Sequence, residues 1–233
     1  MSIYDQVNVW DKDDEFRIEK ITAGDPKAIC DLGCGTGRLT VFMTKAGRNV
    51  WGIDPDAEAI AQAHKKDEKG KITWIIGTSK QMRGLAFDRI SMTANVAQEI
   101  VTDEEWLKTL QDSYDALNNG GQLIFDCRNP NARAWERWTK EHTLTPICLD
   151  DGTAALFWYQ ILDYSSGLAT CTAYIEANDM IISEETFLLR FRSLDDVTDQ
   201  VLRSGFKSFI VYGDWEDKPA DENSKEFLFV ATK

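Results

Sequence analysis

AICDLGCGTGRL, residues 28–39, joins a short apolar segment to a glycine-rich turn. Glycine lacks a Cβ, so glycines at positions 33, 35 and 37 let the backbone approach a ligand closely. The apolar residues of segment 38–46 favour a helix that Gly47 ends, and the first N–H groups of such a helix are free to bind a ligand. The stretch therefore predicts a strand, a ligand-binding turn and a helix.

The rest of the first 128 residues repeats this alternation of strand and helix. Apolar stripes at helical spacing predict a helix over 56–66, and Thr102 begins a capping box before another. Because the strands are separated by helices, they form a parallel sheet with helices on both faces. The sequence therefore predicts an α/β fold. Its expected strands are 27–31, 49–53, 71–76, 87–93 and 122–127.

From about residue 143 the apolar pattern changes to a period of two. Turn residues at 163–167 and 178–179 separate the alternating segments, which predicts an antiparallel meander. The helical pattern returns at Ser193, and two last strands are expected at 207–212 and 226–232. We therefore assign 1–142 and 193–233 to one α/β domain. Residues 143–192 are assigned to an inserted antiparallel β lid or substrate subdomain.

Two acidic residues near the glycine turn indicate the kind of ligand. Asp54 ends the next strand, 17 residues past Gly37, where a carboxylate can accept both hydroxyls of a ribose. A dinucleotide site requires G-x-G-x-x-G, and Arg38 stands where its third glycine would be. Asp31, before the turn, disfavours a pyrophosphate and favours an ammonium group. A nicotinamide-dependent oxidoreductase is therefore a remote alternative.

Three segments carry a resemblance to a known family. Residues 28–39 resemble the first motif of class I methyltransferases that depend on S-adenosylmethionine (SAM), 50–56 (VWGIDPD) resemble the second, and 120–125 (GGQLIF) resemble their fifth strand. The resemblance covers about residues 27–128 and the final helix and hairpin. It implies SAM as the cofactor. It also implies a Rossmann-like, seven-stranded, mostly parallel sheet, with the antiparallel sheet inserted between strands 5 and 6.

The resemblance implies which residues hold this cofactor. The backbone of the glycine turn and Asp31 would contact the methionine end, and Asp54 would hold the ribose. Thr78 and Ser79 would lie beside the adenine, although many relatives carry an acidic residue where Thr78 stands. The implied cofactor residues are Asp31, Gly33, Cys34, Gly35, Asp54, Pro55, Thr78, Ser79, Thr93, Asn95 and Val96.

The acceptor of the methyl group would lie above the same strand ends, against the amino-terminal segment, the loop 126–130 or one face of the inserted sheet. Arg128 directly follows the fifth strand and could pair an acidic acceptor. Either Gln98 or Glu99 could touch the substrate. For each of these side chains, plain packing or a solvent-facing position is the competing interpretation. The candidates are Tyr4, Trp10, Gln98, Arg128, Tyr159 and Arg190.

The composition limits the possible partners. Asp and Glu number 39 against 26 Lys and Arg, and the net charge of −13 repels phosphate backbones, so no nucleic-acid partner is expected. With two histidines and no C-x-x-C pair we expect no metal site, and we interpret the five cysteines as reduced thiols. The sequence lacks an apolar run of roughly 18–20 residues and a signal-like start, which predicts a cytoplasmic protein without a membrane segment.

The sequence therefore predicts an enzyme that transfers a methyl group from SAM to a small-molecule acceptor by in-line displacement. Because the sulfonium is already an activated leaving group, alignment and desolvation can supply most of the catalysis, and no catalytic residue is assigned. A non-catalytic SAM-binding or interaction protein of the same fold is the alternative. The acceptor and its atom, the need for a general base, the oligomeric state and the role of the acidic segment 214–226 stay open.

Overall fold

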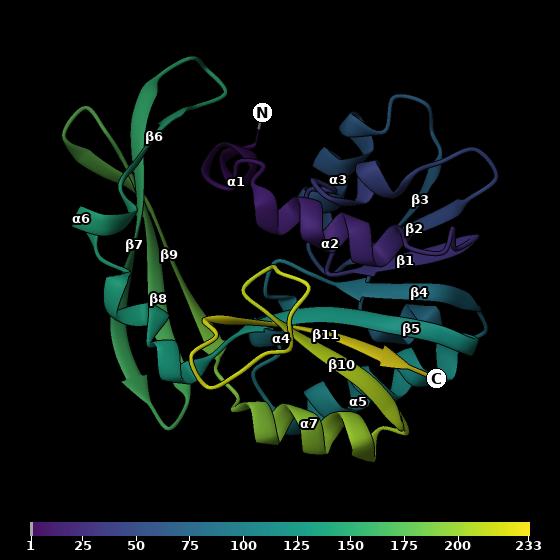
Figure 1. Ribbon diagram of the computed structural model, residues 1–233. Coiled ribbons are helices and arrows are strands. Elements are labelled where there is room, and N and C mark those ends of the chain that lie inside the picture. Colours follow the sequence, from purple (N-terminus) through teal and green to yellow (C-terminus); the bar gives the residue numbers. More distant parts are fainter. Residues whose placement is uncertain (1) are drawn as a thin grey trace.

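The computed structural model describes residues 2–233 and contains two β-sheets (Figure 1). The larger sheet has seven strands in the order β10-β11-β5-β4-β1-β2-β3, and only β11 and β10 run antiparallel to their neighbours. The prediction of a seven-stranded, mostly parallel sheet is therefore confirmed. Its strands are β1 (Ala28–Leu32), β2 (Asn49–Asp54), β3 (Ile72–Ile76), β4 (Phe87–Met92), β5 (Leu117–Arg128), β10 (Ser208–Gly213) and β11 (Glu226–Thr232).

Helices cover both faces of this sheet, as the alternation of elements predicts. On one face lie α2 (Lys12–Thr22) and α3 (Ala57–Lys66), and on the other lie α5 (Asp103–Ala116) and α7 (Leu194–Arg203) (Figure 1). Phe16 and Ile21 of α2 pack with Ile29 of β1, whereas Trp106 of α5 packs with Phe125 of β5. Each large apolar side chain buried in this way stabilises the fold by roughly 1.5–3 kcal/mol.

The predicted starts of the helices are confirmed where a side chain accepts a hydrogen bond from one of the free N–H groups. Thr102 accepts a hydrogen bond from the Glu105 N–H at the start of α5, and Ser193 forms a capping box with Asp196 at the start of α7. Asp56 likewise caps α3 by accepting from the Glu58 N–H. These short-range contacts explain why the sequence pattern located the starts of these helices correctly.

The helix predicted over 38–46 is wrong. The chain there forms only a short 3₁₀ helix, η1 (Thr40–Met43). Thr40 and Val41 are β-branched, which disfavours a longer helix, and the Thr40 hydroxyl donates to Asp31 at 2.6 Å. Met43 is fully buried against the cluster that contains α2. Tertiary contacts therefore hold this segment in a tighter form than its apolar pattern suggests.

The fifth strand also begins earlier than predicted. Residues 117–121, which precede the expected strand 122–127, already lie inside β5. A register shift between Phe87 and Arg89 of β4 accommodates the additional residues. The main prediction for this region, a central parallel strand that ends near residue 128, is unaffected.

The second sheet is antiparallel, with the order β6-β7-β8-β9. It lies between β5 and β10 in the sequence, as predicted, and stands beside the large sheet on the side of α1 (Ile3–Val7) and α4 (Val96–Glu99) (Figure 1). One face packs its apolar side chains around Phe157 and Ala155, together with Ile3 and Val7 of α1. The strands are β6 (Thr145–Cys148), β7 (Ala154–Ser165), β8 (Leu168–Ala177) and β9 (Met180–Arg190). No helix within residues 2–233 is long and apolar enough to cross a membrane.

Candidate functional site

A cavity of about 700 Å³ lies at the carboxyl ends of β1, β2 and β4. It reaches from the glycine turn to the inserted sheet, where Leu149, Asp150 and Glu185 form part of its wall. This is the position at which open parallel sheets bind ligands. Eight of the residues predicted to hold a cofactor line it: Asp31, Gly33, Cys34, Gly35, Asp54, Pro55, Thr93 and Val96.

The glycine turn leaves room over its backbone. Gly33 has φ +76°, and a Cβ there would lie 2.5 Å from the Val96 side chain, so the position requires glycine. At Gly35, with φ +51°, an added Cβ would meet nothing within 4 Å in the described chain. The backbone at Gly35 is therefore open to the cavity and can contact a ligand.

The carboxylate of Asp54 is held in place by two backbone groups. The Gly35 N–H donates to Oδ2 at 2.7 Å, and the Asp56 N–H donates to Oδ1 at 2.9 Å. Each carboxylate oxygen retains a lone pair for a further donor, such as a ribose hydroxyl. Burial raises the pKa of Asp54, and these two hydrogen bonds oppose that shift.

Asp31 is almost fully buried, with 3% of its surface exposed. The hydroxyls of Thr40 and Ser91 donate to its two oxygens at 2.6 and 2.8 Å. Burial raises the pKa of Asp31 to about 6, and the negative charge of Asp54 acts in the same direction. A cationic group bound beside Asp31 would therefore stabilise its charged form.

The cavity wall is strongly acidic. Among residues 2–233 its lining holds seven carboxylates and one basic side chain, that of Arg38. Such a wall attracts cationic ligands and repels phosphates. SAM, with its sulfonium and ammonium groups, matches this charge, and a pyrophosphate-containing dinucleotide does not. The carboxylates belong to Asp31, Asp54, Asp56, Glu58, Glu99, Asp150 and Glu185.

The helix α1 closes one side of the cavity and contacts both sheets. The carboxylate of Asp5 accepts from the Thr36 hydroxyl at 2.7 Å and pairs with Lys66 of α3 at 2.5 Å. The side chain of Gln6 bonds both backbone groups of Cys148 in β6, at 2.8 and 2.9 Å. This short helix therefore connects the glycine turn to the inserted sheet.

Thr78 and Ser79, which the resemblance implies lie beside the adenine, make their hydrogen bonds outside the cavity lining. The Ser79 hydroxyl is buried and donates to Asp112 of α5 at 2.8 Å, and Thr78 caps the 3₁₀ helix η2 (Ser79–Met82) through Gln81. Neither side chain lines the cavity. In this structure both residues serve local packing and capping, and their predicted place beside the adenine is not supported by the geometry.

Glu99, the last residue of α4, lines the cavity and keeps part of its side chain exposed. The cavity walls raise the pKa of Glu99 to about 7, mainly by desolvation and secondarily through the charge of Asp54. The positive charge of Arg128 opposes this shift. A carboxyl group that titrates near neutral pH inside a cavity can exchange a proton with a ligand.

Arg128, at the end of β5, is held from several sides. Its Nη1 donates to Gln98 Oε1 at 3.1 Å, and its Nε lies 3.7 Å from Oε1 of Glu226 on the neighbouring strand. The guanidinium carbon lies 5.3 Å from the centre of the Trp138 ring, within the range of a cation–π contact. Arg128 is therefore a fixed cation, and Gln98 serves to orient it.

The comparisons with known proteins agree with this geometry. Residues 29–121 match the model of the methyltransferase domain family. The glycine/sarcosine N-methyltransferase of Halorhodospira halochloris is 26% identical over 250 residues, covering 99% of this chain and 85% of that protein. This chain is a SAM-dependent methyltransferase. The prediction made from the glycine turn is confirmed, and the similarities offer no support for an oxidoreductase or a non-catalytic protein.

Solved structures place this methyltransferase in the same fold. A SAM-dependent methyltransferase from Clostridium acetobutylicum superposes with a TM-score of 0.75 at 17% identity, covering 99% of this chain and 96% of that one. The amino pentose methyltransferase CalS10 from Micromonospora echinaspora, solved with SAM bound, gives a TM-score of 0.71 at 17% identity. It covers 100% of this chain and 97% of the other. The fold includes the second sheet, because these alignments span the whole methyltransferase.

The remaining acceptor candidates of the methyltransferase fall into two groups. Tyr4 lines the cavity, and its charge acts together with burial to raise the pKa of Tyr159 to about 12. Trp10 lies on the surface against Phe42, with ring centres 4.4 Å apart. Arg190 donates to a backbone carbonyl at 2.8 Å and lies near Asp103. Among these candidates the cavity lining includes Tyr4, while Arg128 and Tyr159 lie close enough for their charges to interact and Gln98 is buried behind Arg128. Trp10 and Arg190 make their contacts elsewhere.

The sequence did not single out Asp126, Arg17 or Glu226 in this methyltransferase. Asp126 lies two residues before Arg128 on the same face of β5, and Arg17 of α2 pairs with it. Glu226 faces Arg128 across the antiparallel pair of β5 and β11. The alternation of β5 could have placed Asp126 beside Arg128, but the other two contacts join segments far apart in the sequence.

Proposed function

We propose that this methyltransferase N-methylates a small amine that carries a carboxylate, an amino acid. The observation that carries the proposal is a pair of opposite charges at one edge of the cavity, where Glu99 lines the wall and Arg128 lies close enough for its charge to act on Glu99. Glu99 offers a carboxylate that titrates near pH 7, and Arg128 offers a guanidinium fixed by Gln98, Glu226 and Trp138. A zwitterionic amino acid matches this pair, with its ammonium group toward Glu99 and its carboxylate toward Arg128.

The cofactor half is formed by the glycine turn and the ends of β1 and β2. Asp54 would hold the ribose hydroxyls, Asp31 the ammonium group, and the backbone at Gly33 and Gly35 the span between them. When bound there, SAM supplies a methyl group that its sulfonium makes electrophilic. The carboxylates that line the cavity favour such a cationic ligand.

The role of Glu99 follows from the chemistry of an amine acceptor. An ammonium nitrogen has no lone pair, so it must lose a proton before it can act as a nucleophile. A base works best when its pKa lies near the working pH, and the pKa of Glu99, raised to about 7, meets this condition. Glu99 therefore accepts the proton at its carboxylate while the neutral amine faces the methyl group.

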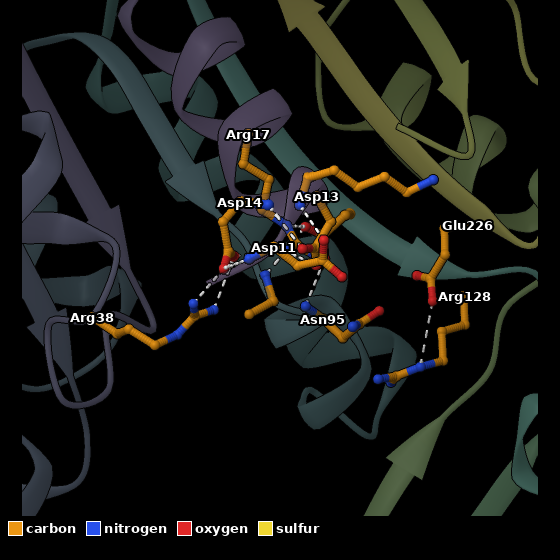
Figure 2. A network of polar contacts seen from close by, with 11 residues as sticks. Asp11, Asp13, Asp14, Arg17, Arg38, Asn95, Arg128 and Glu226 are labelled. Atoms are coloured by element: carbon orange, nitrogen blue, oxygen red, sulfur yellow. Dashed lines mark hydrogen bonds and ion pairs between the residues drawn. The ribbon is translucent and has the colours of Figure 1, made fainter. Parts of the chain in front are cut away.

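Arg128 and its neighbours orient the acceptor. The guanidinium retains donors beyond the bond to Gln98, and these can bind an acceptor carboxylate in two-pronged fashion. In Figure 2 the amide of Asn95 is directed toward the side on which Arg128 lies. Its Oδ1 is buried without a hydrogen-bond partner in the described chain, so this amide is a further candidate contact for the acceptor.

The inserted segment 143–192 would form the outer wall of the acceptor site. Tyr159 of β7 faces Arg128 and Glu99 closely enough for their charges to act on its pKa, and Glu185 of β9 lines the cavity. Aromatic side chains there exclude water, which would otherwise compete for the amine and its charges. We therefore propose that this segment is the substrate subdomain of the methyltransferase.

The relatives favour an amine over an oxygen or carbon acceptor. The glycine/sarcosine N-methyltransferase aligns over nearly the whole chain, whereas the ubiquinone O-methyltransferase of Hydrogenovibrio crunogenus, at 29% identity, covers 54% of it. An O-methyltransferase would require a hydroxyl acceptor, and a zwitterionic site does not select for one. The charges of the site and the names of the longest matches therefore agree.

The test compares three acceptors of similar size in the presence of SAM. Glycine tests the complete pair of charges, glycinamide lacks the carboxylate, and glycolate replaces the amine with a hydroxyl. We expect methylated glycine by mass spectrometry, an acceptor KM at least about tenfold higher for glycinamide, and no product from glycolate, because a charge-assisted contact contributes about 1.5–3 kcal/mol.

Variants of the arginine complete this test. Arg128→Gln should raise the KM for glycine about tenfold or more and leave that for glycinamide nearly unchanged, since the amide makes no ion pair. Arg203→Gln removes an exposed arginine of α7 and serves as the matched control. Equal turnover of glycine and glycinamide, or methylation of glycolate, would contradict the proposal.

A further inference from the structure

Two consecutive residues at the end of β4 adopt a backbone conformation that side chains disfavour. Ala94 has φ +60° and Asn95 has φ +68°, and neither is glycine. Residues with a Cβ reach this left-handed region only when their surroundings hold them there. The turn matters to the site because Ala94 and Val96 line the cavity and Asn95 precedes α4, which carries Gln98 and Glu99.

Asp126 of β5 supplies the hydrogen bonds that hold this turn. Its Oδ1 accepts from the Asn95 N–H at 2.6 Å, and its Oδ2 accepts from the Ala94 N–H at 3.1 Å. The Asp126 side chain is fully buried. In this left-handed conformation the two successive N–H groups point at one carboxylate, so Asp126 stabilises the shape of the turn.

Arg17 of α2 neutralises this buried carboxylate. Its Nε donates to Asp126 Oδ2 at 2.6 Å, and its own side chain is only 3% exposed. Asp13 and Asp14, one turn before it on the helix, both bind its Nη1. Without Arg17 the charge of Asp126 would be buried and uncompensated, which costs several kcal/mol.

The same network reaches the other wall of the cavity. Asp14 accepts from both terminal nitrogens of Arg38, with a distance of 2.9 Å for Nη2. Arg38 follows the glycine turn and lines the cavity. Figure 2 shows the chain of contacts from Arg38 through Asp14 and Arg17 to the Asn95 backbone. One face of α2 therefore holds the glycine turn and the β4 turn at the same time.

We propose that Asp126 and Arg17 are positioning residues for the acceptor. They fix the left-handed turn at Ala94 and Asn95, and through it the direction of the Asn95 amide and the start of α4. This inference rests on the proposed function, in which Arg128 binds the carboxylate of an amino acid and the Asn95 amide is a further contact for the acceptor. Neither Asp126 nor Arg17 lines the cavity: the Asp126 oxygens bond the turn and Arg17, and the Nε and Nη1 of Arg17 bond three carboxylates.

Loss of Asp126 and Arg17 should affect the acceptor KM and SAM affinity differently. The cofactor is held by Asp31, Asp54 and the glycine turn, which keep their own hydrogen bonds when the β4 turn relaxes. The acceptor depends on the turn directly. Loss of the positioning pair should therefore raise the acceptor KM and leave SAM affinity nearly unchanged.

The main variant replaces both charges together, Arg17→Met with Asp126→Asn, so that no unpaired ion remains buried. We expect cooperative thermal unfolding, an acceptor KM raised about tenfold or more, and a SAM dissociation constant within about threefold of the original. Arg48→Met is the matched control, because Arg48 is equally buried but bonds backbone carbonyls at the opposite ends of the strands. It should leave the acceptor KM unchanged.

A rescue separates positioning from general damage to the fold. Glycine reaches positive φ without strain, so Ala94→Gly added to the double variant should restore the acceptor KM to within about threefold of the original. A merely structural ion pair would not be rescued by a change in the β4 turn. Absence of rescue, or a loss confined to SAM affinity, would overturn the inference.

Nuclear magnetic resonance keeps this test independent of the acceptor's identity. An N–H bonded to a carboxylate resonates at unusually low field, so the Ala94 and Asn95 amide signals should shift upfield in the double variant and stay in place in Arg48→Met. If the original protein methylates no amino acid but these amides shift, the proposed function fails while the control of the turn by Asp126 stands. If the amides do not shift, the inference itself fails.

Discussion

The cofactor half and the acceptor half of the cavity are built in different ways. The proposed cofactor half comes from residues 31–54, one β-turn-β segment that offers backbone N–H groups and short carboxylates to a ligand. The proposed acceptor half would gather Tyr4 and Glu99, which line the cavity, with Arg128 and Tyr159 beside them, from four distant parts of the chain. A local segment can be recognised in a sequence as a motif, whereas a site assembled by the fold cannot.

The largest expected effect is a loss of turnover that leaves SAM binding nearly unchanged. Glu99→Gln removes the proposed base but keeps the size of the side chain, so kcat should fall by about 10²–10⁴-fold while SAM binding stays within about threefold. Steady-state kinetics and calorimetry measure the two quantities. For the original protein, kcat/KM should rise with pH through about 7, because Glu99 must be ionised to accept a proton.

The control for this prediction is the pH profile of the variant. Without Glu99 the rise near pH 7 should disappear. A variant with unchanged kcat and the same profile would show that another group accepts the proton, and the assignment of Glu99 would be wrong.

The second prediction concerns the cofactor half alone. Asp54→Ala removes the expected acceptor of the ribose hydroxyls, and SAM affinity should weaken by about 1.5–3 kcal/mol, which is roughly 10- to 150-fold in dissociation constant. Titration calorimetry measures the loss, and Glu68→Gln, which removes a charge from the surface beyond α3, is the control. Unchanged affinity in a folded Asp54→Ala variant would mean that the ribose lies elsewhere.

The smallest expected effect concerns Asp31, whose negative charge should lower folding stability but favour SAM binding. The pKa of Asp31 in the folded chain, about 6, lies above its ordinary value near 3.8. Between these two pH values Asp31 therefore holds a proton in the folded state that it has already released in the unfolded state. At higher pH the buried, charged carboxylate of Asp31 opposes folding. Asp31→Asn should raise the free energy of unfolding at pH 8 by on the order of 1–3 kcal/mol.

This gain should shrink as the pH falls from 6 toward 4, where Asp31 becomes neutral in both states. The same variant should bind SAM more weakly, because it loses the charge that faces the ammonium group. Denaturant unfolding at pH 8 and pH 4 measures the first effect, and calorimetry measures the second. A variant less stable than the original at pH 8 would show that its hydrogen bonds with Thr40 and Ser91 outweigh the burial of charge.

The sequence predicted those parts of the molecule that depend on neighbours in the chain. The glycine turn, Asp31 and Asp54 lie within one segment, and their spacing alone places them at one edge of the sheet. The capped helices and the antiparallel insertion were recognised for the same reason, since Thr102 and Ser193 act on residues three positions away. Element type and order follow from such local signals.

The failures lie where distant segments meet. The short η1 replaced the predicted helix because Thr40 bonds to Asp31 and Met43 packs with α2. The buried hydrogen bond from the Ser79 hydroxyl to Asp112, 33 residues later, was not predicted either. No pattern within a single segment announces a contact of this kind, and the role of Asp126 at the Ala94–Asn95 turn was missed for the same reason.

The acidic lining of the cavity has a consequence for turnover. SAM carries a sulfonium charge that is lost when its methyl group leaves, so the spent cofactor is one unit less positive than the fresh one. A wall with seven carboxylates and one arginine among the described residues therefore binds the fresh form more strongly than the spent form. We therefore expect this wall to weaken binding of the spent cofactor relative to the fresh one, and added salt should reduce the difference by screening it.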